Sequence, residues 1–76
     1  MKLKKLAKVI YEEGTASENR KITVATMRGD ILWEGIAKNL EAFSETEDWS
    51  VCEILVDDSD EAFEEKYDKG KIIIVY

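Results

Sequence analysis

Histidine and proline are absent from this chain of 76 residues, and cysteine occurs once, as Cys52. Without histidine the chain lacks the usual general base at neutral pH and the commonest metal ligand. One cysteine cannot form an intramolecular disulfide, and small secreted domains usually need several, so the sequence favours a reducing compartment. The absence of proline excludes cis-proline turns and polyproline motifs.

The chain also lacks a long apolar run, since the longest is Ile72–Tyr76. A membrane-spanning helix needs about 20 such residues. The lysines at positions 2, 4, 5 and 8 are interleaved with apolar residues, whereas a signal peptide places its charges before an unbroken apolar segment. We therefore expect a cytoplasmic protein with no targeting segment and no membrane partner.

Charge is distributed unevenly along the chain. The net charge is −6, but residues 41–68 hold twelve acidic residues and one basic residue, Lys66, for a net charge of −11. Because phosphate binding needs the opposite sign, we expect no nucleic-acid partner. Electrostatics permits a basic protein partner. The stronger interpretation is an acidic surface that only keeps a small protein soluble.

The overall composition is that of one small folded domain. Hydrophobic residues make up 45% of the chain and charged residues 37%, which is typical of a folded chain rather than a disordered one. A chain of this length buries only a small core. We expect a single domain over residues 1–76.

The first half predicts a helix, a hairpin and a second, short helix. Leu3, Leu6, Ala7 and Ile10 recur at helical spacing and predict a helix over residues 2–13 that docks this apolar stripe, with a stop at the following glycine. Residues 22–27 and 31–36 are β-prone and flank a turn, so they predict a β-hairpin. Residues 37–43 predict a short helix.

The turn leaves two hairpin registers open, which differ in the residue that shares a face with Ile22 and Val24. A two-residue loop would place Trp33 on that face. A type I turn with Gly29 as a bulge would place Leu32 there instead. We favour the bulge, because glycine readily adopts the left-handed conformation that it requires.

The second half predicts a strand, a helix and a strand. Trp49–Val56 alternates in hydrophobicity and predicts the third strand. An acidic capping box at Asp58 and Glu61 predicts a helix that runs to Lys69. Ile72–Tyr76 is apolar on both faces, so we expect this strand inside the sheet or buried in a dimer interface.

Together these elements predict an α+β fold. The N-terminal helix packs on a small, mainly antiparallel sheet of about four strands, and the second long helix lies between the last two strands. That helix is also long enough to cross over between parallel strands, which is the alternative topology.

The acidic residues of segment 57–68 are the candidate metal ligands. An EF-hand loop requires glycine at its sixth position, where this segment has Ala62 or Phe63. The helix cap already explains the acids, so we expect no metal and no cofactor. Paired carboxylates can act as general acid and base, but a domain this small has little room for a substrate cleft.

Four other features have a structural and a functional interpretation. Cys52 lacks an activating base and lies in an apolar strand, so we interpret it as a buried structural thiol. Arg28-Gly29-Asp30 matches the tripeptide of integrin ligands, which we interpret as a coincidence of turn chemistry. Trp33 and Trp49 could anchor an interface, but small domains more often use tryptophan for core or half-buried packing.

A loose pattern runs through most of the chain: an N-terminal Lys/Leu helix, a glycine turn, an apolar-x-x-Gly return strand and an A-x-x-L segment. The corresponding residues are Leu3–Ile10, Gly29, Leu32–Gly35 and Ala37–Leu40, followed by the two further strands of the pattern, Val51–Val56 and Ile72–Tyr76. With this pattern, residues 21–40 resemble small uncharacterised proteins of phages and prophages of Gram-positive bacteria. The chain departs from them by the helix predicted between its last two strands. The resemblance implies no catalytic residues.

We therefore expect a non-enzymatic protein-interaction module, of which an inhibitor or a DNA mimic would be particular forms. The alternatives are a carboxylate-based metal-binding or minor enzymatic domain and a homodimeric structural component. The candidate interaction surface is a set of acidic residues in the second half: Glu45, Glu47, Asp48, Asp57, Asp58, Asp60, Glu61 and Glu64.

Overall fold

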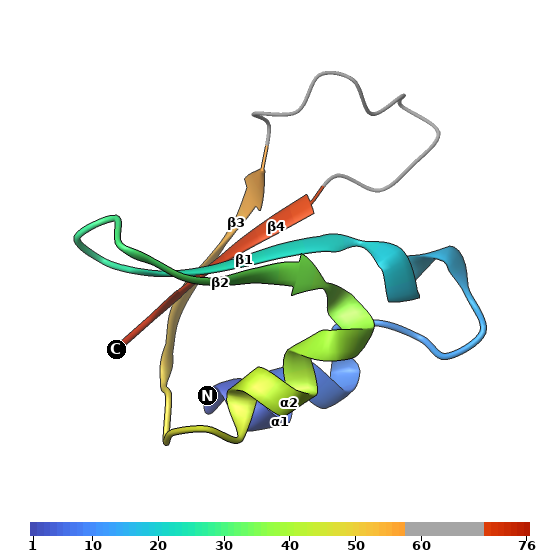
Figure 1. Cartoon of the computed structure of the whole chain (residues 1–76), viewed down its shortest axis with the longest axis horizontal. Coiled ribbons are helices and arrows are strands. Elements are labelled where there is room, and N and C mark those ends of the chain that lie inside the picture. The colour runs from blue at the N-terminus through green and yellow to red at the C-terminus, as the bar shows by residue number, and fades with distance from the viewer. Residues whose placement is uncertain (58–69) are drawn as a thin grey trace.

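A computed structural model describes residues 1–57 and 70–76 of the chain (Figure 1). Its elements in chain order are α1 (Leu3–Val9), the 3₁₀ turn η1 (Ala16–Asn19), β1 (Lys21–Thr26), β2 (Ile31–Ile36), the 3₁₀ turn η2 (Ala37–Asn39), α2 (Leu40–Ser44), β3 (Val51–Asp57) and β4 (Gly70–Val75). The fold class is α+β, as predicted. None of the helices in this described part has the length and apolarity needed to cross a membrane.

The four strands form one sheet in the order β2-β1-β4-β3. β1 pairs antiparallel with β2 and parallel with β4, and β4 pairs antiparallel with β3. The prediction that the last apolar strand is internal is confirmed, because β4 lies between β1 and β3. The alternative topology is wrong, since the last two strands are antiparallel. The helix predicted over residues 58–69 lies outside the described residues.

The hairpin turn between β1 and β2 forms as predicted. The Gly29 N–H donates to the Thr26 carbonyl at 2.9 Å, and the Thr26 N–H donates to the Asp30 carbonyl at 2.9 Å. Gly29 has a φ of +94°, in the left-handed region. This is the type I turn followed by a glycine bulge that the sequence indicated.

A second bulge, at Leu32, reverses the predicted face of the return strand. Gly35 lies opposite Ile22, so Trp33 and not Leu32 shares the face of the buried β1 residues. A ladder continued regularly from the turn would instead place Glu34 opposite Ile22 and direct its carboxylate into the core. The bulge turns that carboxylate outward and brings the indole inward, which avoids burying an unpaired charge.

Helix α1 carries the predicted apolar stripe but is shorter than the predicted range. Leu3, Leu6 and Ala7 are buried, whereas the helix ends at Val9. No side chain caps its N-terminus, and its first turn contains no acidic residue to favour the positive end of its dipole. Gly14, with a φ of +80°, belongs to the turn that follows. The helix therefore depends on docking its stripe.

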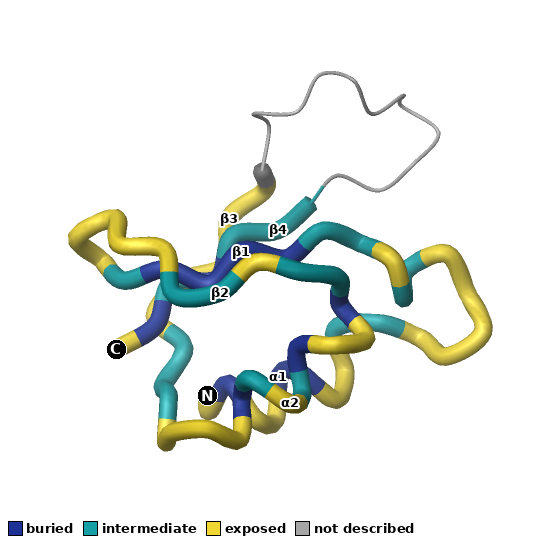
Figure 2. Tube along the Cα trace, viewed as in Figure 1, coloured by how far each residue is buried: buried dark blue, intermediate teal, exposed yellow. Residues whose placement is uncertain are grey.

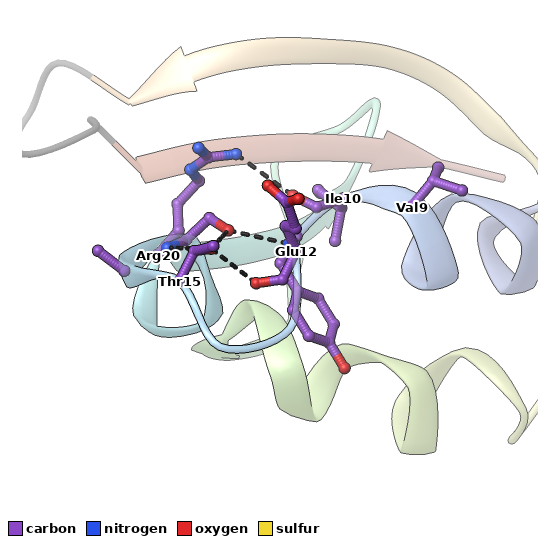
Figure 3. Close-up of a pocket in the computed structure, with 8 residues that line it drawn as sticks. Val9, Ile10, Glu12, Thr15 and Arg20 are labelled. Atoms are coloured by element: carbon purple, nitrogen blue, oxygen red, sulfur yellow. Dashed lines mark hydrogen bonds between the residues drawn. The ribbon is translucent and has the colours of Figure 1, made fainter.

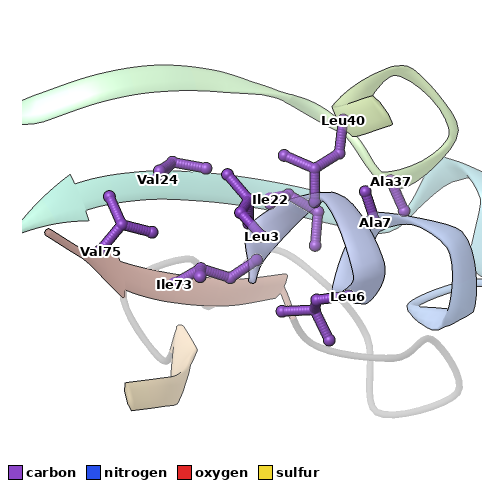
Figure 4. Close-up of a cluster of buried hydrophobic side chains, with 9 residues drawn as sticks. All are labelled: Leu3, Leu6, Ala7, Ile22, Val24, Ala37, Leu40, Ile73 and Val75. Atoms are coloured by element: carbon purple, nitrogen blue, oxygen red, sulfur yellow. The ribbon is translucent and has the colours of Figure 1, made fainter. Parts of the chain in front are cut away.

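The core lies between one face of the sheet and the two α-helices, which lie on the same side of the sheet (Figures 1 and 4). Its buried side chains are Leu3, Leu6, Ala7, Ile22, Val24, Ala37, Leu40, Ile73 and Val75. The strands β1 and β4 supply the sheet side of this core. On the opposite face of the sheet there is no helix among the described residues. Thr23 and Ala25, which β1 presents on that face, are nevertheless buried.

Candidate functional site

Strand β3 is the most exposed of the described strands (Figure 2). Ile54, Leu55 and Val56 expose 46%, 40% and 49% of their surface. Ile54 and Val56 face the helix side, and Leu55 faces the other side. Among the described strands, β4 alone pairs with this strand, so β3 forms an edge of the sheet. Large apolar side chains on an exposed edge mark a place where another strand can pair.

The start of β3 is held from both sides. On the inner side, Ser50 and Tyr76 exchange two backbone hydrogen bonds of 3.0 Å. On the outer side, the Val51 N–H donates to the Met1 carbonyl at 2.8 Å, and Lys2 forms an antiparallel bridge with Ser50. The N-terminus therefore covers the outer edge of β3 as far as Val51, and the open part of the edge begins at Cys52.

A stack of three aromatic rings connects the two edges of the sheet. Phe43 of α2 stacks on Trp33 of β2 at 5.9 Å and 23° between ring planes, and on Trp49, just before β3, at 5.9 Å and 13°. Both tryptophans are half-buried, as predicted. The indole nitrogen of Trp49 is buried without a hydrogen-bond partner among the described residues. The stack fixes where β3 enters the sheet.

The prediction that Cys52 is buried is wrong, because its thiol is exposed. The β3–β4 register shifts between Val51 and Glu53, so Cys52 is the extra residue of a bulge on an edge strand. Its Sγ lies 3.7 Å from the Sδ of Met27, which is itself exposed at the hairpin tip. Apolar neighbours in the sequence indicated burial, but the position at the sheet edge leaves the thiol in contact with solvent.

The predicted acidic surface is divided by β3. Glu45, Glu47 and Asp48 are exposed in the connector before the strand, and Asp57 is its last residue. The length of β3, about 20 Å, separates these two groups. Asp48 also pairs with the amino group of Lys2 at 3.1 Å. The other four predicted residues lie outside the described part: Asp58, Asp60, Glu61 and Glu64.

A second candidate is a shallow cavity of about 500 Å³ between the end of α1 and the connector to β1 (Figure 3). The Glu12 N–H donates to the Ser17 hydroxyl at 2.9 Å, and Arg20 Nη1 donates to the Ile10 carbonyl at 3.3 Å. These bonds hold the connector together. The cavity lining contains one carboxylate, that of Glu12, and so no pair of carboxylates. Its polar groups serve the local fold.

No metal-binding group of three or more cysteine or acidic side chains occurs within residues 1–57 and 70–76. Comparison of the chain with protein-family models, with characterised proteins and with solved structures found no match. The candidate site therefore has to be judged by its own geometry.

The residues that sequence reasoning missed are Ile54, Leu55 and Val56. Their alternation predicted a strand but gave no sign of an edge position. The one available signal was the neighbouring strand Ile72–Tyr76, whose uniform apolarity required an internal place and so left the edge for another strand.

Proposed function

We propose that this protein is a non-enzymatic protein-interaction module that binds its partner through the open edge of β3. The observation that carries the proposal is the row Ile54, Leu55 and Val56, which is 40–49% exposed on an edge strand. A row of this kind is costly to leave open, because it invites pairing with other chains. A binding function accounts for its exposure.

Charge supports a partner of opposite sign. Within residues 41–57 the chain carries six acidic residues and no basic residue, and the exposed acids Glu45 and Glu47 lie at the entry to β3. An acidic border favours encounter with a positively charged surface and disfavours nucleic acid. The phage or mobile-element setting is part of this proposal through the resemblance of residues 21–40. An inhibitor that mimics DNA would be one form of such a module.

The other two predicted functions have less support. The homodimer was inferred from the apolarity of Ile72–Tyr76 on both faces, and the internal position of β4 accounts for that apolarity without a dimer. The metal-dependent alternative draws on segment 57–68, of which only Asp57 is described. No observation on the described residues favours it.

Capture from a bacterial lysate tests the proposal, at about 0.05 M and about 0.5 M salt. The affinity tag should follow a linker at the C-terminus, because residues added before Met1 would run along the edge of β3. Val56→Thr removes an apolar group from the edge, and Val9→Thr makes the same change on α1, where Val9 is 68% exposed.

The expected result is a salt-sensitive protein that the wild type and Val9→Thr retain and that Val56→Thr loses. Retention that is identical for the three baits, or the absence of any salt-sensitive protein, would count against binding through β3.

A further inference from the structure

The outer edge of β3 is already partly filled, and the way it is filled shows what else fits there. The N-terminal residues lie extended and antiparallel beside the start of the strand, with Lys2 bridged to Ser50. The amino group of Lys2 reaches the Asp48 carboxylate at 3.1 Å and the Ser50 hydroxyl at 3.1 Å. An extended segment that carries a lysine therefore pairs with this edge inside the molecule itself.

The edge continues beyond this segment from Cys52 to Asp57 without a described neighbour on its outer side. Its two faces differ in chemistry. Ile54 and Val56 form an apolar face on the helix side, whereas Glu53 lies on the opposite face beside Leu55. Opposite residues of paired strands share a face, so a strand added here would meet apolar groups at every second position and a carboxylate at an intervening one.

We propose that the partner of this site presents an extended segment in which basic and apolar residues alternate, and that this segment adds to β3 as a fifth strand of the sheet. The inference rests on the proposed function. Backbone hydrogen bonds along the edge supply affinity, and the alternating side chains supply specificity. Apolar residues cover Ile54 and Val56, a lysine or arginine pairs with Glu53, and a further long basic side chain covers Leu55 with its methylene groups.

A second copy of the chain fits this edge less well. In an antiparallel two-fold pairing centred on Leu55, residue 53 of one copy lies opposite residue 57 of the other, and both are acidic. Centred on Ile54, the pairing places Glu53 opposite Leu55, which provides no countercharge. Two copies also bring together net charges of −6 each. Like charges directly opposite in a sheet are destabilising.

Three end-blocked peptides test the proposal on the full chain. The first is Lys-Val-Lys-Val-Lys-Val, the second replaces every lysine by glutamate, and the third is the lysine peptide with alternate amides N-methylated on the edge facing β3. Binding is followed by amide chemical shifts and by amide hydrogen exchange of the labelled protein. The N-methylated peptide keeps the charge and side chains but loses the hydrogen bonds of a paired strand.

The lysine peptide should shift the amide signals of residues 52–57 and protect those amides that point away from β4. The N-methylated peptide should bind at least about tenfold more weakly. The glutamate peptide should not bind. Glu53→Lys should lower the affinity for the lysine peptide by about fivefold and raise the affinity for the glutamate peptide. Glu34→Lys, the same charge change on the opposite edge, should change neither by more than about twofold.

Two results would overturn the inference. Equal binding of the lysine and N-methylated peptides would indicate attraction between charges without strand addition. Slow exchange, in the free protein, of those amides of residues 52–57 that point away from β4 would indicate that the edge is already occupied. Sedimentation then tells whether a second copy occupies it. If either result is obtained but a lysate protein still binds in a way that Val56→Thr abolishes, the proposed function stands and only the strand-addition inference fails. If no such lysate protein is found either, both the inference and the proposed function fail.

Discussion

Ile54 and Ile73 lie directly opposite each other in the β3–β4 ladder and face the same side of the sheet, yet one is 46% exposed and the other is fully buried. Both come from apolar, β-prone segments of similar composition. The difference shows that apolar composition decides whether a segment forms a strand, whereas neighbours decide whether the strand is covered.

The neighbours of the two strands explain the difference. β4 has a strand on each side and contributes Ile73 and Val75 to the cluster packed under α1 and α2. β3 lies at the edge, and its last residues extend past the region that the two helices cover (Figure 2). Residues of one kind thus serve as core in β4 and as surface in β3.

The largest expected effect comes from the same truncation at these two positions. Ile73→Ala removes a fully buried side chain and should lower the free energy of unfolding by about 2–5 kcal/mol. Ile54→Ala removes a side chain that already meets solvent and should cost about 1 kcal/mol or less. Urea unfolding followed by circular dichroism measures both. Equal losses would show that another part of the chain, or another copy, covers Ile54 in solution.

The next largest effect is expected in the aromatic stack that connects the two edges of the sheet. A Cβ added at Gly35 would lie 2.6 Å from the Trp33 ring, so Gly35→Ala must displace that ring from Phe43. We expect a loss of about 1–3 kcal/mol in unfolding free energy and a weaker near-ultraviolet circular dichroism signal.

A double-mutant cycle isolates the cause of that loss. In a Trp33→Leu background the ring is gone, and Gly35→Ala should then be nearly neutral. A cost that persists without the ring would place its origin in the backbone of β2 and not in the aromatic stack.

The sequence predicted those parts of the fold that depend on neighbouring residues. The turn at Gly29 is set by the left-handed preference of glycine, and the stripe of α1 is set by the spacing of its leucines. The internal position of β4 followed from its apolarity on both faces. Each of these features involves residues close together in the chain.

The features that the sequence did not predict depend on contacts between distant residues. The bulge at Leu32 follows from packing Trp33 on Phe43 while keeping Glu34 outside, which requires the position of α2. The exposure of Cys52 follows from the order of strands in the sheet. The candidate site was missed for that same reason, since the alternating pattern of residues 49–56 predicts a strand without placing it at an edge.

A smaller effect is expected where the N-terminus covers the start of β3. Lys2→Ala removes the ion pair with Asp48, whose side chain is 83% exposed, so the loss should be about 0.2–1 kcal/mol and should fall at about 1 M salt. Faster hydrogen exchange of the Val51 amide would accompany it, because that amide donates to Met1. Lys4→Ala, the same charge change on α1, should leave the Val51 amide unchanged.

The smallest effect on stability, and a direct measure of exposure, is expected at Cys52. Cys52→Ser should change the free energy of unfolding by less than about 0.5 kcal/mol, because the thiol is on the surface. The thiol of the native protein should react with a disulfide reagent within about tenfold of its rate in denaturant. No opening of the sheet is needed to reach it.

Ser44 provides the matched buried position. It is 1% exposed on α2, and its hydroxyl donates to the Glu41 carbonyl at 2.6 Å. In a Cys52→Ser background, the thiol introduced by Ser44→Cys can react only when α2 opens, so its rate should be at least about a hundredfold lower than that of Cys52. If the thiols at positions 52 and 44 both react slowly and at comparable rates, β3 is covered in solution. The difference in exposure between β3 and β4 would then hold only for a single, isolated copy of the chain. A fast rate at Cys52 and a slow rate at position 44 would establish that the edge of β3 is open to a partner while the core beside it stays closed.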